Sequence, residues 1–368
     1  MNKSTGRLVI ASIIGLSLVA AACGDEKTAT EDPTTVAATG VVTTVPGPTT
    51  PSVAPVTGTL QASGSSFQLA FEEEAILAFT DANPGTTITY GGGGSGKGRT
   101  DLADKTVDFA GSDGAFKAED LPADPILYFP ILLGAVTVSY NLDAVDTLQL
   151  SPDTIAMIFQ RQITQWDDPA IAGDNPGVAL PSTDITVVHR TDGSGTTENF
   201  TKWLAAAAPA AWTLTPGSTV EWPADTQGGN GNQGVAQIVS STSGAVGYVD
   251  LSDAVAAGLS YADVMNKSGA YITPTSESAS VAGDGIEVAD NLVFHAYDSS
   301  APTAYPITLQ SWVIVYAKQS SDDKAALVRA YLTYLLTEGQ AILPELDFAP
   351  LPDSILTKAI AQLDQITS

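Results

Sequence analysis

The feature that most constrains the fold is a regular alternation of strand-like and helix-like segments along most of the 368-residue chain. TTITY (86–90) has the β-branched and aromatic residues of a strand, and the apolar run at 128–141 predicts a long buried strand. Apolar side chains recur at helical spacing over 67–81 and again over 322–339. Alternation of this kind predicts an α/β fold whose strands are mainly parallel.

Composition narrows the range of possible ligands. Hydrophobic residues make up 44% of the chain, enough for a packed core, whereas 41 Asp and Glu outnumber 15 Lys and Arg. The net charge of -26 argues against a nucleic-acid partner, because a phosphate backbone needs a basic surface. The same charge repels small anions at long range, so an anion site would depend on short-range donors.

The N-terminus carries the pattern of an export signal. Lys3 and Arg7 precede an apolar stretch at 8–20 that is too short to span a membrane. Small residues then lead to Cys23, the only cysteine in the sequence, which is typical of a bacterial lipoprotein signal. We therefore expect removal of a signal peptide at 1–22 and lipidation of Cys23. Ordinary signal-peptidase cleavage and a buried incidental thiol are the alternatives.

Residues 23–58 are rich in Thr, Pro, Ala and Val and show the period of neither a helix nor a strand. Such a composition predicts a flexible to extended tether. With a lipid at its start, this tether would hold an exported globular body on the outer face of the cell membrane, or in a periplasm.

Three segments rich in glycine and serine follow predicted strands, at 63–66, 91–98 and 191–197. A helix start leaves backbone N–H groups free and carries about half a positive charge, and glycine lets an anion approach it. A single segment of this kind is ordinarily a helix cap, but three on one α/β body predict an oxyanion site beyond the strand ends. The run 91–98 also resembles a nucleotide P-loop, except that Gly98 stands where Ser or Thr would hold magnesium.

Two kinds of charged residue beside these segments suggest how an anion would be recognised. Arg190 offers a planar fork for two oxygens that Asp192 could hold in place, although a surface ion pair is the alternative. Asp113 ends the segment VDFAGSD (107–113), where a carboxylate would repel an anion that carries no proton. Monohydrogen phosphate has a proton to donate and sulfate has none, so Asp113 would select phosphate, unless it only caps a turn.

At these residues the sequence resembles the substrate-binding protein of the high-affinity phosphate ABC importer. The matching segments span nearly the whole body and are GSSF (64–67), YGGGGSGKG (90–98), VDFAGSD (107–113), HRTDGSGTTENF (189–200), GNQGVAQIVSSTSGAVGYVD (231–250) and LDFAPLPDSI (346–355). The resemblance implies an α/β periplasmic-binding-protein fold of type II, in which two lobes with doubly wound sheets are joined by a two-strand hinge. Lobe one would comprise residues 59–138 and 305–368, and lobe two residues 139–304.

The resemblance also implies which residues hold the phosphate. The ligand would contact hydroxyl groups, backbone N–H groups, one cation and one carboxylate acceptor, namely Ser66, Phe67 through its N–H, Ser95, Asp113, Arg190, Ser194, Gly195 and Thr196. Asp192 would steady Arg190. The chain departs from its relatives at Gln68, where proline is usual, and it adds Lys97 and Arg99 near the glycine run.

The implied function is capture of inorganic phosphate outside the membrane between two closing lobes, and delivery to an ABC permease that a separate ATPase drives. The implied protein is a monomer and not an enzyme, and it needs no cofactor, metal or nucleic acid. Alternatives are a binding protein for sulfate, molybdate or another tetrahedral oxyanion, an exported phosphatase or serine hydrolase, and a surface adhesin or sensor. The enzyme is disfavoured because Ser194 lacks the usual nucleophile motif and His189 would point away from Arg190.

Overall fold

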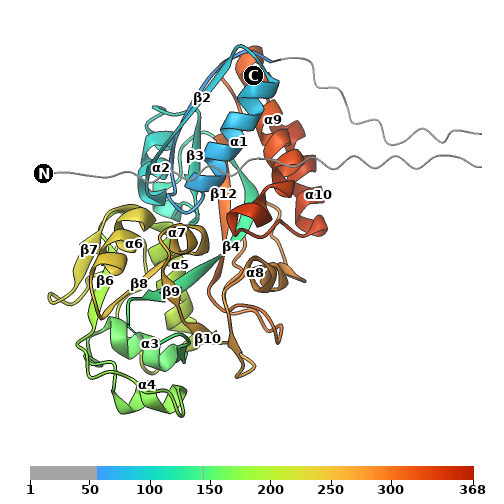
Figure 1. Cartoon of the computed structure of the whole chain (residues 1–368). Coiled ribbons are helices and arrows are strands. Elements are labelled where there is room, and N and C mark those ends of the chain that lie inside the picture. The colour runs from blue at the N-terminus through green and yellow to red at the C-terminus, as the bar shows by residue number, and fades with distance from the viewer. Residues whose placement is uncertain (1–55, 144) are drawn as a thin grey trace, which may run out of the picture. The chain divides into compact units, whose positions relative to one another are not determined.

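The computed structural model describes residues 56–368 with the exception of residue 144. The predicted signal peptide (1–22), Cys23 and nearly all of the predicted tether (23–58) therefore lie outside the described residues. Within the described range, no helix combines the length and the apolar character that crossing a membrane requires. Strands and helices alternate along the body, as the sequence predicted for the α/β class (Figure 1).

The strands have the following bounds: β1 (Gly58–Gly64), β2 (Thr86–Gly93), β3 (Phe109–Ser112), β4 (Ile126–Tyr140), β5 (Gln149–Leu150), β6 (Thr186–Arg190), β7 (Gln227–Gly229), β8 (Ala245–Asp250), β9 (Ser260–Tyr261), β10 (Asp263–Met265), β11 (Tyr271–Ile272) and β12 (Thr308–Tyr316). The α-helices are α1 (Leu69–Ala82), α2 (Ser95–Ala103), α3 (Pro152–Phe159), α4 (Pro169–Asp174), α5 (Gly195–Ala207), α6 (Gly231–Ser241), α7 (Leu251–Ala256), α8 (Ser276–Gly283), α9 (Asp322–Leu336) and α10 (Asp353–Gln362).

One continuous sheet has the strand order β2-β1-β3-β12-β4-β8-β6-β7, with β9 pairing beside β4. Toward one end β1 pairs in parallel with β2 and β3, and toward the other β6 pairs in parallel with β7 and β8. In the centre β12 runs antiparallel to β3 and β4, and β4 runs antiparallel to β8 and β9. The prediction of mainly parallel strands is therefore wrong for the centre. There the chain leaves along β4 and returns along its neighbour β12, which makes the two antiparallel.

Strand β4 belongs to both ends of this sheet. Its first part pairs with β12, as far as Ala135 opposite Thr308, and its second part pairs with β8, from Val136 opposite Asp250 onwards. We call β2, β1, β3, β12 and the first part of β4, with the helices packed on them, the first half. The second half is the remainder of β4 with β8, β6, β7 and their helices. In Figure 1, β4 runs from one group of elements to the other.

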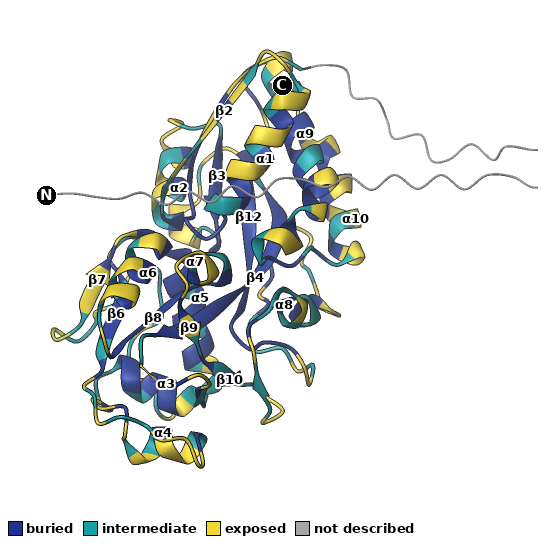
Figure 2. Cartoon of the chain, in the orientation of Figure 1, coloured by how far each residue is buried: buried dark blue, intermediate teal, exposed yellow. Residues whose placement is uncertain are grey.

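The long apolar run explains why β4 can pass through the middle of the fold. Its side chains are buried without interruption from Tyr128 to Tyr140, as the dark strand in Figure 2 shows. A run that is buried on both faces is typical of a central strand. The returning chain lies beside β4 at the change of partner, where the Val136 N–H donates to the Ile307 carbonyl at 2.9 Å. The Tyr305 hydroxyl donates to the Val136 carbonyl, also at 2.9 Å.

Helices α1 and α9 cover one face of the first half. The spacing of α1 buries Phe71, Ala75 and Phe79, and the Phe79 ring meets the Tyr331 ring of α9 edge-on at 5.2 Å. Burial of each large apolar side chain contributes about 1.5–3 kcal/mol. Helix α1 begins at Leu69, two residues later than the spacing predicted, because 65–68 form the turn that leaves β1.

The segment between α8 and β12 also contacts the first half. Ser276 at the start of α8 donates to the Phe348 carbonyl at 2.6 Å, and the Trp312 indole on β12 donates to the Leu292 carbonyl at 3.0 Å. These contacts tie part of the predicted lobe two to strands of lobe one. The lobe boundary at residue 304 stays a prediction.

Candidate functional site

Parallel strands of both halves end at residues that the sequence singled out. β1 ends at Gly64, directly before the segment 65–68, and β3 ends at Ser112, directly before Asp113. In the second half, β6 ends at Arg190. Because ligands of open α/β sheets bind beyond the carboxyl ends of parallel strands, these residues are where a ligand is expected.

Three helices begin among these strand ends. α2 begins at Ser95, α5 begins after its N-cap Ser194, and α6 begins at Gly231. Each start carries about half a positive charge and unpaired N–H groups. Gly94, with φ 91°, precedes α2, and a Cβ at this position would lie 2.2 Å from Asp192 Oδ2. Glycine is therefore what lets the start of α2 approach the second half.

Asp113 is enclosed by hydroxyl groups from three segments of the first half. Ser65 Oγ lies 2.7 Å and Ser95 Oγ 3.1 Å from Asp113 Oδ2, while Ser311 Oγ of β12 lies 2.6 Å from Oδ1. The carboxyl is 1% exposed. Burial raises the pKa of Asp113, and the neighbouring hydroxyls and the charge of Arg190 act against that rise.

Arg190 is the buried cation of the second half. Its Nε donates to Asp192 Oδ1 at 2.8 Å, and its Nη2 donates to Asp192 Oδ2. Its Nη1 lies 3.0 Å from Asn232 Oδ1 and 3.3 Å from Thr196 Oγ1. Burial alone would raise the pKa of Asp192, but its bonds to Arg190 and the charge of Arg190 lower it. These contacts use four of the five guanidinium N–H groups and fix the orientation of the fork.

Contacts between the halves join the two sets of residues. The contacts are the Gly96 N–H to the Gly193 carbonyl at 2.7 Å, the Asn232 N–H to Ser66 Oγ at 3.2 Å, Asn199 Nδ2 to the Asp113 carbonyl at 2.7 Å, and the ion pair Arg99–Glu198 at 3.8 Å. The predicted site residues are accordingly buried. The exposed fraction is at most 4% for Phe67, Arg190 and the other side chains of the set, which are Ser66, Ser95, Asp113, Ser194 and Thr196.

The structure brings all the predicted residues to this junction, where several already have protein partners. The Phe67 N–H donates to Ser65 Oγ at 3.0 Å, and Ser194 Oγ accepts from the Thr197 N–H at 3.0 Å as the cap of α5. Gly195 lies against Ser95 and Asp113, since a Cβ on it would be 2.3 Å from Ser95 Oγ. What the junction offers chemically is a set of N–H and O–H donors, one oriented cation and one shielded carboxyl group.

Comparison with known proteins identifies the family. Residues 49–338 match the protein family that is described as "PBP superfamily domain". The chain is 33% identical over 310 residues to the phosphate-binding protein PstS of Pasteurella multocida, covering 83% of this chain and 89% of that protein. It is also 33% identical over 321 residues to phosphate-binding protein PstS 3 of Mycobacterium tuberculosis, covering 84% and 86%. The chain belongs to the PstS family of phosphate-binding proteins.

Solved structures support the fold of this PstS-family chain. A high-affinity periplasmic phosphate-binding protein, solved with bound phosphate, matches with a TM-score of 0.70 at 21% identity and covers 83% of this chain and 94% of that chain. A phosphate-binding protein from Stenotrophomonas maltophilia matches with a TM-score of 0.66 at 20% identity and covers 83% and 93%. The predicted two-lobed periplasmic-binding-protein fold is thereby confirmed.

Five polar residues at this junction were not predicted individually from the sequence, although Ser65 lies in the predicted segment 63–66: Ser65, Asn199, Asn232, Gln310 and Ser311. Asn199 and Asn232 lie inside segments that carry the family resemblance, so their position was a usable signal. Gln310 and Ser311 form the one polar pair within the apolar strand β12, and Gln310 Nε2 lies 3.2 Å from the Asp113 carbonyl. A buried polar pair in such a strand needs partners, and this requirement could have drawn attention to it.

The glycine run does not have the geometry of a nucleotide loop. Gly91 and Gly93 still belong to strand β2, where they pair with β1. Lys97, the residue at the P-loop lysine position, is half exposed and forms an ion pair with Asp101. Arg99 donates to the Gly114 carbonyl at 2.8 Å, next to Asp113. The two added cations therefore serve protein contacts, one on the surface and one beside the site.

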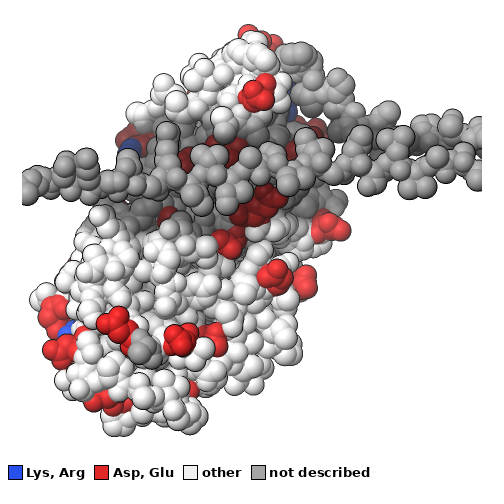
Figure 3. All heavy atoms as spheres, viewed as in Figure 1, with Lys and Arg blue, Asp and Glu red and all other residues white. Residues whose placement is uncertain are grey.

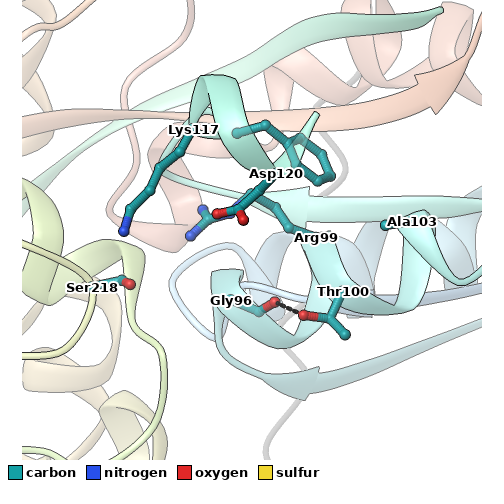
Figure 4. A pocket seen from close by; sticks show the side chains of 8 residues that line it. Gly96, Arg99, Thr100, Ala103, Lys117, Asp120 and Ser218 are labelled. Carbon is teal, nitrogen blue, oxygen red and sulfur yellow. Dashed lines mark hydrogen bonds between the residues drawn. The ribbon is translucent and has the colours of Figure 1, made fainter. Parts of the chain in front are cut away.

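A pocket of about 370 Å³ adjoins the site on the side of α2 (Figure 4). It is lined by Gly96, Arg99, Thr100, Ala103, Phe116, Lys117, Asp120 and Ser218. Gly96 and Ser218 also take part in the junction, because the Ser218 carbonyl accepts from the Ser194 N–H at 2.9 Å. Figure 3 shows mainly carboxylates among the charged side chains on the face it displays. The pocket is lined by two cations, Arg99 and Lys117, and by one carboxylate, Asp120.

The arrangement around Ser194 lacks the geometry of a nucleophile. Within the described residues, Ser194 Oγ accepts a backbone N–H and has no hydrogen bond to a histidine. The His189 ring stacks on Trp222 at 5.2 Å, and its Nδ1 lies 3.0 Å from the Arg190 carbonyl. A base that activates a hydroxyl must lie within hydrogen-bond reach of it.

Proposed function

We propose that this chain binds inorganic phosphate between its two halves and delivers it to an ABC permease. The observation that carries the proposal is the meeting of helix starts from both halves around one oriented cation, Arg190, and one hydroxyl-lined carboxyl, Asp113. Helix starts and the charge of a buried arginine favour a small oxyanion, and the carboxyl favours one that carries a proton. The names of the PstS relatives support the same ligand.

In this proposal each half contributes its own kind of contact. The first half offers Ser66, the Phe67 N–H and Ser95 as donors, and Asp113 accepts the proton of the phosphate. The second half offers the start of α5 with the donors Ser194, Gly195 and Thr196, together with the charge of Arg190, which Asp192 holds in place. Phosphate would replace part of the present protein contacts of these groups.

Entry of the ligand requires the halves to separate, because the site residues are buried at the junction. We propose two lobes that move about the change of partner in β4, with lobe one at 59–138 and 305–368 and lobe two at 139–304. Phosphate favours the closed form because it contacts both lobes at once. The Gly96–Gly193 and Asn232–Ser66 bonds would form as the lobes close.

The cellular setting is part of the proposal. Residues 1–22 would direct export, Cys23 would carry the lipid, and 23–58 would tether a monomer to the outer face of the membrane. The permease and its ATPase would be separate proteins. The chain itself would not catalyse a reaction.

Calorimetric titration with phosphate and with sulfate tests the proposal, using the whole mature chain at pH 7.5. We expect tight phosphate binding and negligible sulfate binding. Asp113→Asn removes the charged acceptor, so the phosphate affinity should fall about 10- to 100-fold, the range expected for a charged hydrogen bond. The preference for phosphate over sulfate should narrow in the same variant.

Glu72→Gln is the matched control, since Glu72 is another buried carboxyl of the first half and its side chain bonds to Tyr331 of α9. It should leave the phosphate affinity unchanged. Equal affinity of the wild type for both anions would instead indicate a general oxyanion-binding protein. Hydrolysis of a chromogenic phosphate ester in proportion to protein concentration would indicate an enzyme.

A further inference from the structure

A continuous chain of polar contacts runs from strand β2 to the Asp113 carboxyl. Tyr90 Oη lies 2.7 Å from the Ser65 carbonyl oxygen and 3.0 Å from Gln68 Nε2. On the other side of the amide, Gln68 Oε1 lies 2.9 Å from Ser311 Oγ, which in turn lies 2.6 Å from Asp113 Oδ1. Gln68, the residue that replaces the usual proline, is fully buried in the middle of this chain.

The hydrogens of this chain can be placed by starting at the one group that can only accept. The Ser65 carbonyl has no hydrogen, so the single hydroxyl hydrogen of Tyr90 points to it. The phenol oxygen then has only lone pairs for Gln68, which places Nε2 of the amide toward Tyr90 and Oε1 toward Ser311. Amide orientation follows from its network in this way.

The last link concerns the hydroxyl of Ser311. Gln68 Oε1 can only accept, so the single hydrogen of Ser311 Oγ points to Gln68. Ser311 then presents lone pairs to Asp113 Oδ1 at 2.6 Å, a distance that requires a hydrogen between the two oxygens. The remaining source of that hydrogen is the carboxyl group itself. The other carboxyl oxygen, Oδ2, accepts from Ser65 and Ser95 and needs none.

We propose that Gln68 and Tyr90 are positioning residues that turn the Ser311 hydroxyl away from Asp113 and thereby hold a proton on Asp113 Oδ1. The fold makes room for them at Gly111, where a Cβ would lie 1.8 Å from Gln68 Nε2 and 2.0 Å from Tyr90 Oη. β12 runs antiparallel beside β3 with Trp312 opposite Ser112, so residues 310 and 311 lie just beyond the end of β3, where both reach Asp113.

Other charged and titratable groups around Asp113 act in both directions. From the second half, Arg190 favours the carboxylate, while Asp192 neutralises part of that charge. Arg99 of α2 reaches the adjacent Gly114, but it also pairs with Glu198 of α5. From α1, Glu72 faces Tyr90 rather than Asp113. Burial itself raises the pKa of Asp113 and so favours the protonated carboxyl.

The inference deepens the proposed function, on which its consequence for anion binding rests. A protonated Asp113 donates a hydrogen bond, so it can face sulfate as well as phosphate, whereas the carboxylate rejects sulfate. Gln68 would therefore set the pH below which the site loses its selectivity. Removing the Gln68 acceptor frees the Ser311 hydrogen for the carboxylate, which stabilises the ionised form and lowers the pKa of Asp113.

Carbon-13 NMR of aspartate-labelled protein tests the proton directly, without any anion ligand. The Asp113 carboxyl signal is assigned by its loss in Asp113→Asn and followed from pH 5 to pH 9. We expect the titration midpoint of the Asp113 carboxyl in the wild type to lie well above the usual pKa of aspartate. In Gln68→Leu the midpoint should fall by about one pH unit or more, a tenfold loss of proton affinity.

Tyr90→Phe is the second variant, and it keeps the test decisive if Gln68→Leu does not fold. Without the phenol the amide can turn its Nε2 to Ser311, so the midpoint should fall in the same direction. Gln362→Leu is the control, because it removes another buried amide of the first half, bonded to the Tyr128 carbonyl, and should leave the midpoint in place. An unchanged or raised midpoint in the folded variants would overturn the inference.

Competition between phosphate and sulfate over the same pH range separates this inference from the proposed function. Sulfate binding to the wild type should strengthen as the pH falls through the titration midpoint of Asp113. In Gln68→Leu and Tyr90→Phe, the pH at which sulfate binding begins should be lower. If phosphate fails to bind at any pH, the proposed function is wrong and the NMR titration still decides the inference. If phosphate binds but the variants do not move the onset, the inference alone is wrong.

Discussion

Two buried carboxyl groups of the first half, Asp113 and Glu72, have opposite surroundings. Asp113 is contacted by the hydroxyls of Ser65, Ser95 and Ser311 and lies at the junction with Arg190. Glu72 lies between α1 and α9, where Tyr331 donates to its Oε2 at 2.6 Å and, within the described residues, its Oε1 has no partner. Burial raises the pKa of Glu72 to about 7, and the Tyr331 bond acts against that rise.

The difference shows how the hydrogen-bond partners of a buried carboxyl determine whether it can serve in ligand binding or mainly lowers stability when it ionises. Oδ2 of Asp113 accepts from Ser65 and Ser95, and Oδ1 faces the Ser311 hydroxyl, so each oxygen has a polar neighbour whether or not the carboxyl holds its proton. Among the described residues Glu72 has Tyr331 as its one donor, so ionisation of the carboxyl leaves a charged oxygen without a hydrogen bond. We therefore expect Asp113 to govern binding and Glu72 to govern the pH dependence of stability.

The largest expected effect comes from Glu72→Gln. Glu72 has its pKa raised from 4.5 to about 7 in the folded state, so the folded protein keeps the proton that the unfolded chain loses between these values. Wild-type stability should therefore fall as the pH rises through this window, by up to about 3 kcal/mol at pH 8. Urea unfolding at pH 5, 6, 7 and 8 should show that the unfolding free energy of the variant increases relative to that of the wild type as the pH rises. A constant difference across the four values would contradict the role assigned to Glu72.

A smaller effect is expected from Tyr331→Phe, which removes the one donor that the residues of 56–368 described by the structure give to the Glu72 carboxyl. The variant should lose about 1–3 kcal/mol of unfolding free energy at pH 8, the cost of a buried acceptor left without its partner. The pKa of Glu72 should rise further in this variant. The fall in unfolding free energy with rising pH should therefore continue to a higher pH than in the wild type. The same substitution in a Glu72→Gln background should cost less, which a double-mutant cycle measures. Additive costs would show that the bond to Glu72 does not matter.

The smallest effect is expected from Ser65→Ala, which makes Asp113 more like Glu72. The carboxyl keeps Ser95 and Ser311 as partners, and the Phe67 N–H also loses its acceptor. Unfolding free energy should fall by about 1 kcal/mol, and the Asp113 midpoint in the NMR titration should rise. Ser276→Ala removes a serine bond elsewhere in the first half and should leave that midpoint unchanged. A lowered midpoint in Ser65→Ala would show that Ser65 does not donate to the carboxyl.

The sequence predicted the parts of the site that lie close together along the chain. Arg190 and Asp192 are two residues apart, and the start of α5 follows at once, so one short motif placed all three. The alternation of strands and helices likewise predicted the α/β class. Asp113 and its expected selection of a protonated anion were also predicted from the sequence, and the resemblance to a known family implied the same role.

The partners of Asp113 were harder to predict, because they depend on the order of strands in the sheet. Ser311 is 198 positions away in the sequence, and it reaches Asp113 only because β12 lies antiparallel beside β3. Gln68 was recognised as a departure from the family, but its role required the positions of Tyr90 and Ser311.

The unbroken strand β4 limits how the two halves can move. Its ladder passes from β12 at Ala135 to β8 at Val136, so sliding along the strand would break backbone hydrogen bonds in both halves. The motion that leaves both ladders intact is a rotation about this point. Gly134 lies one residue before it, and a Cβ there would be 2.6 Å from the Phe67 ring. The point about which we propose that the halves rotate therefore lies against the Phe67 ring, and a larger side chain at this glycine should alter the opening angle and the position of Ser66 together.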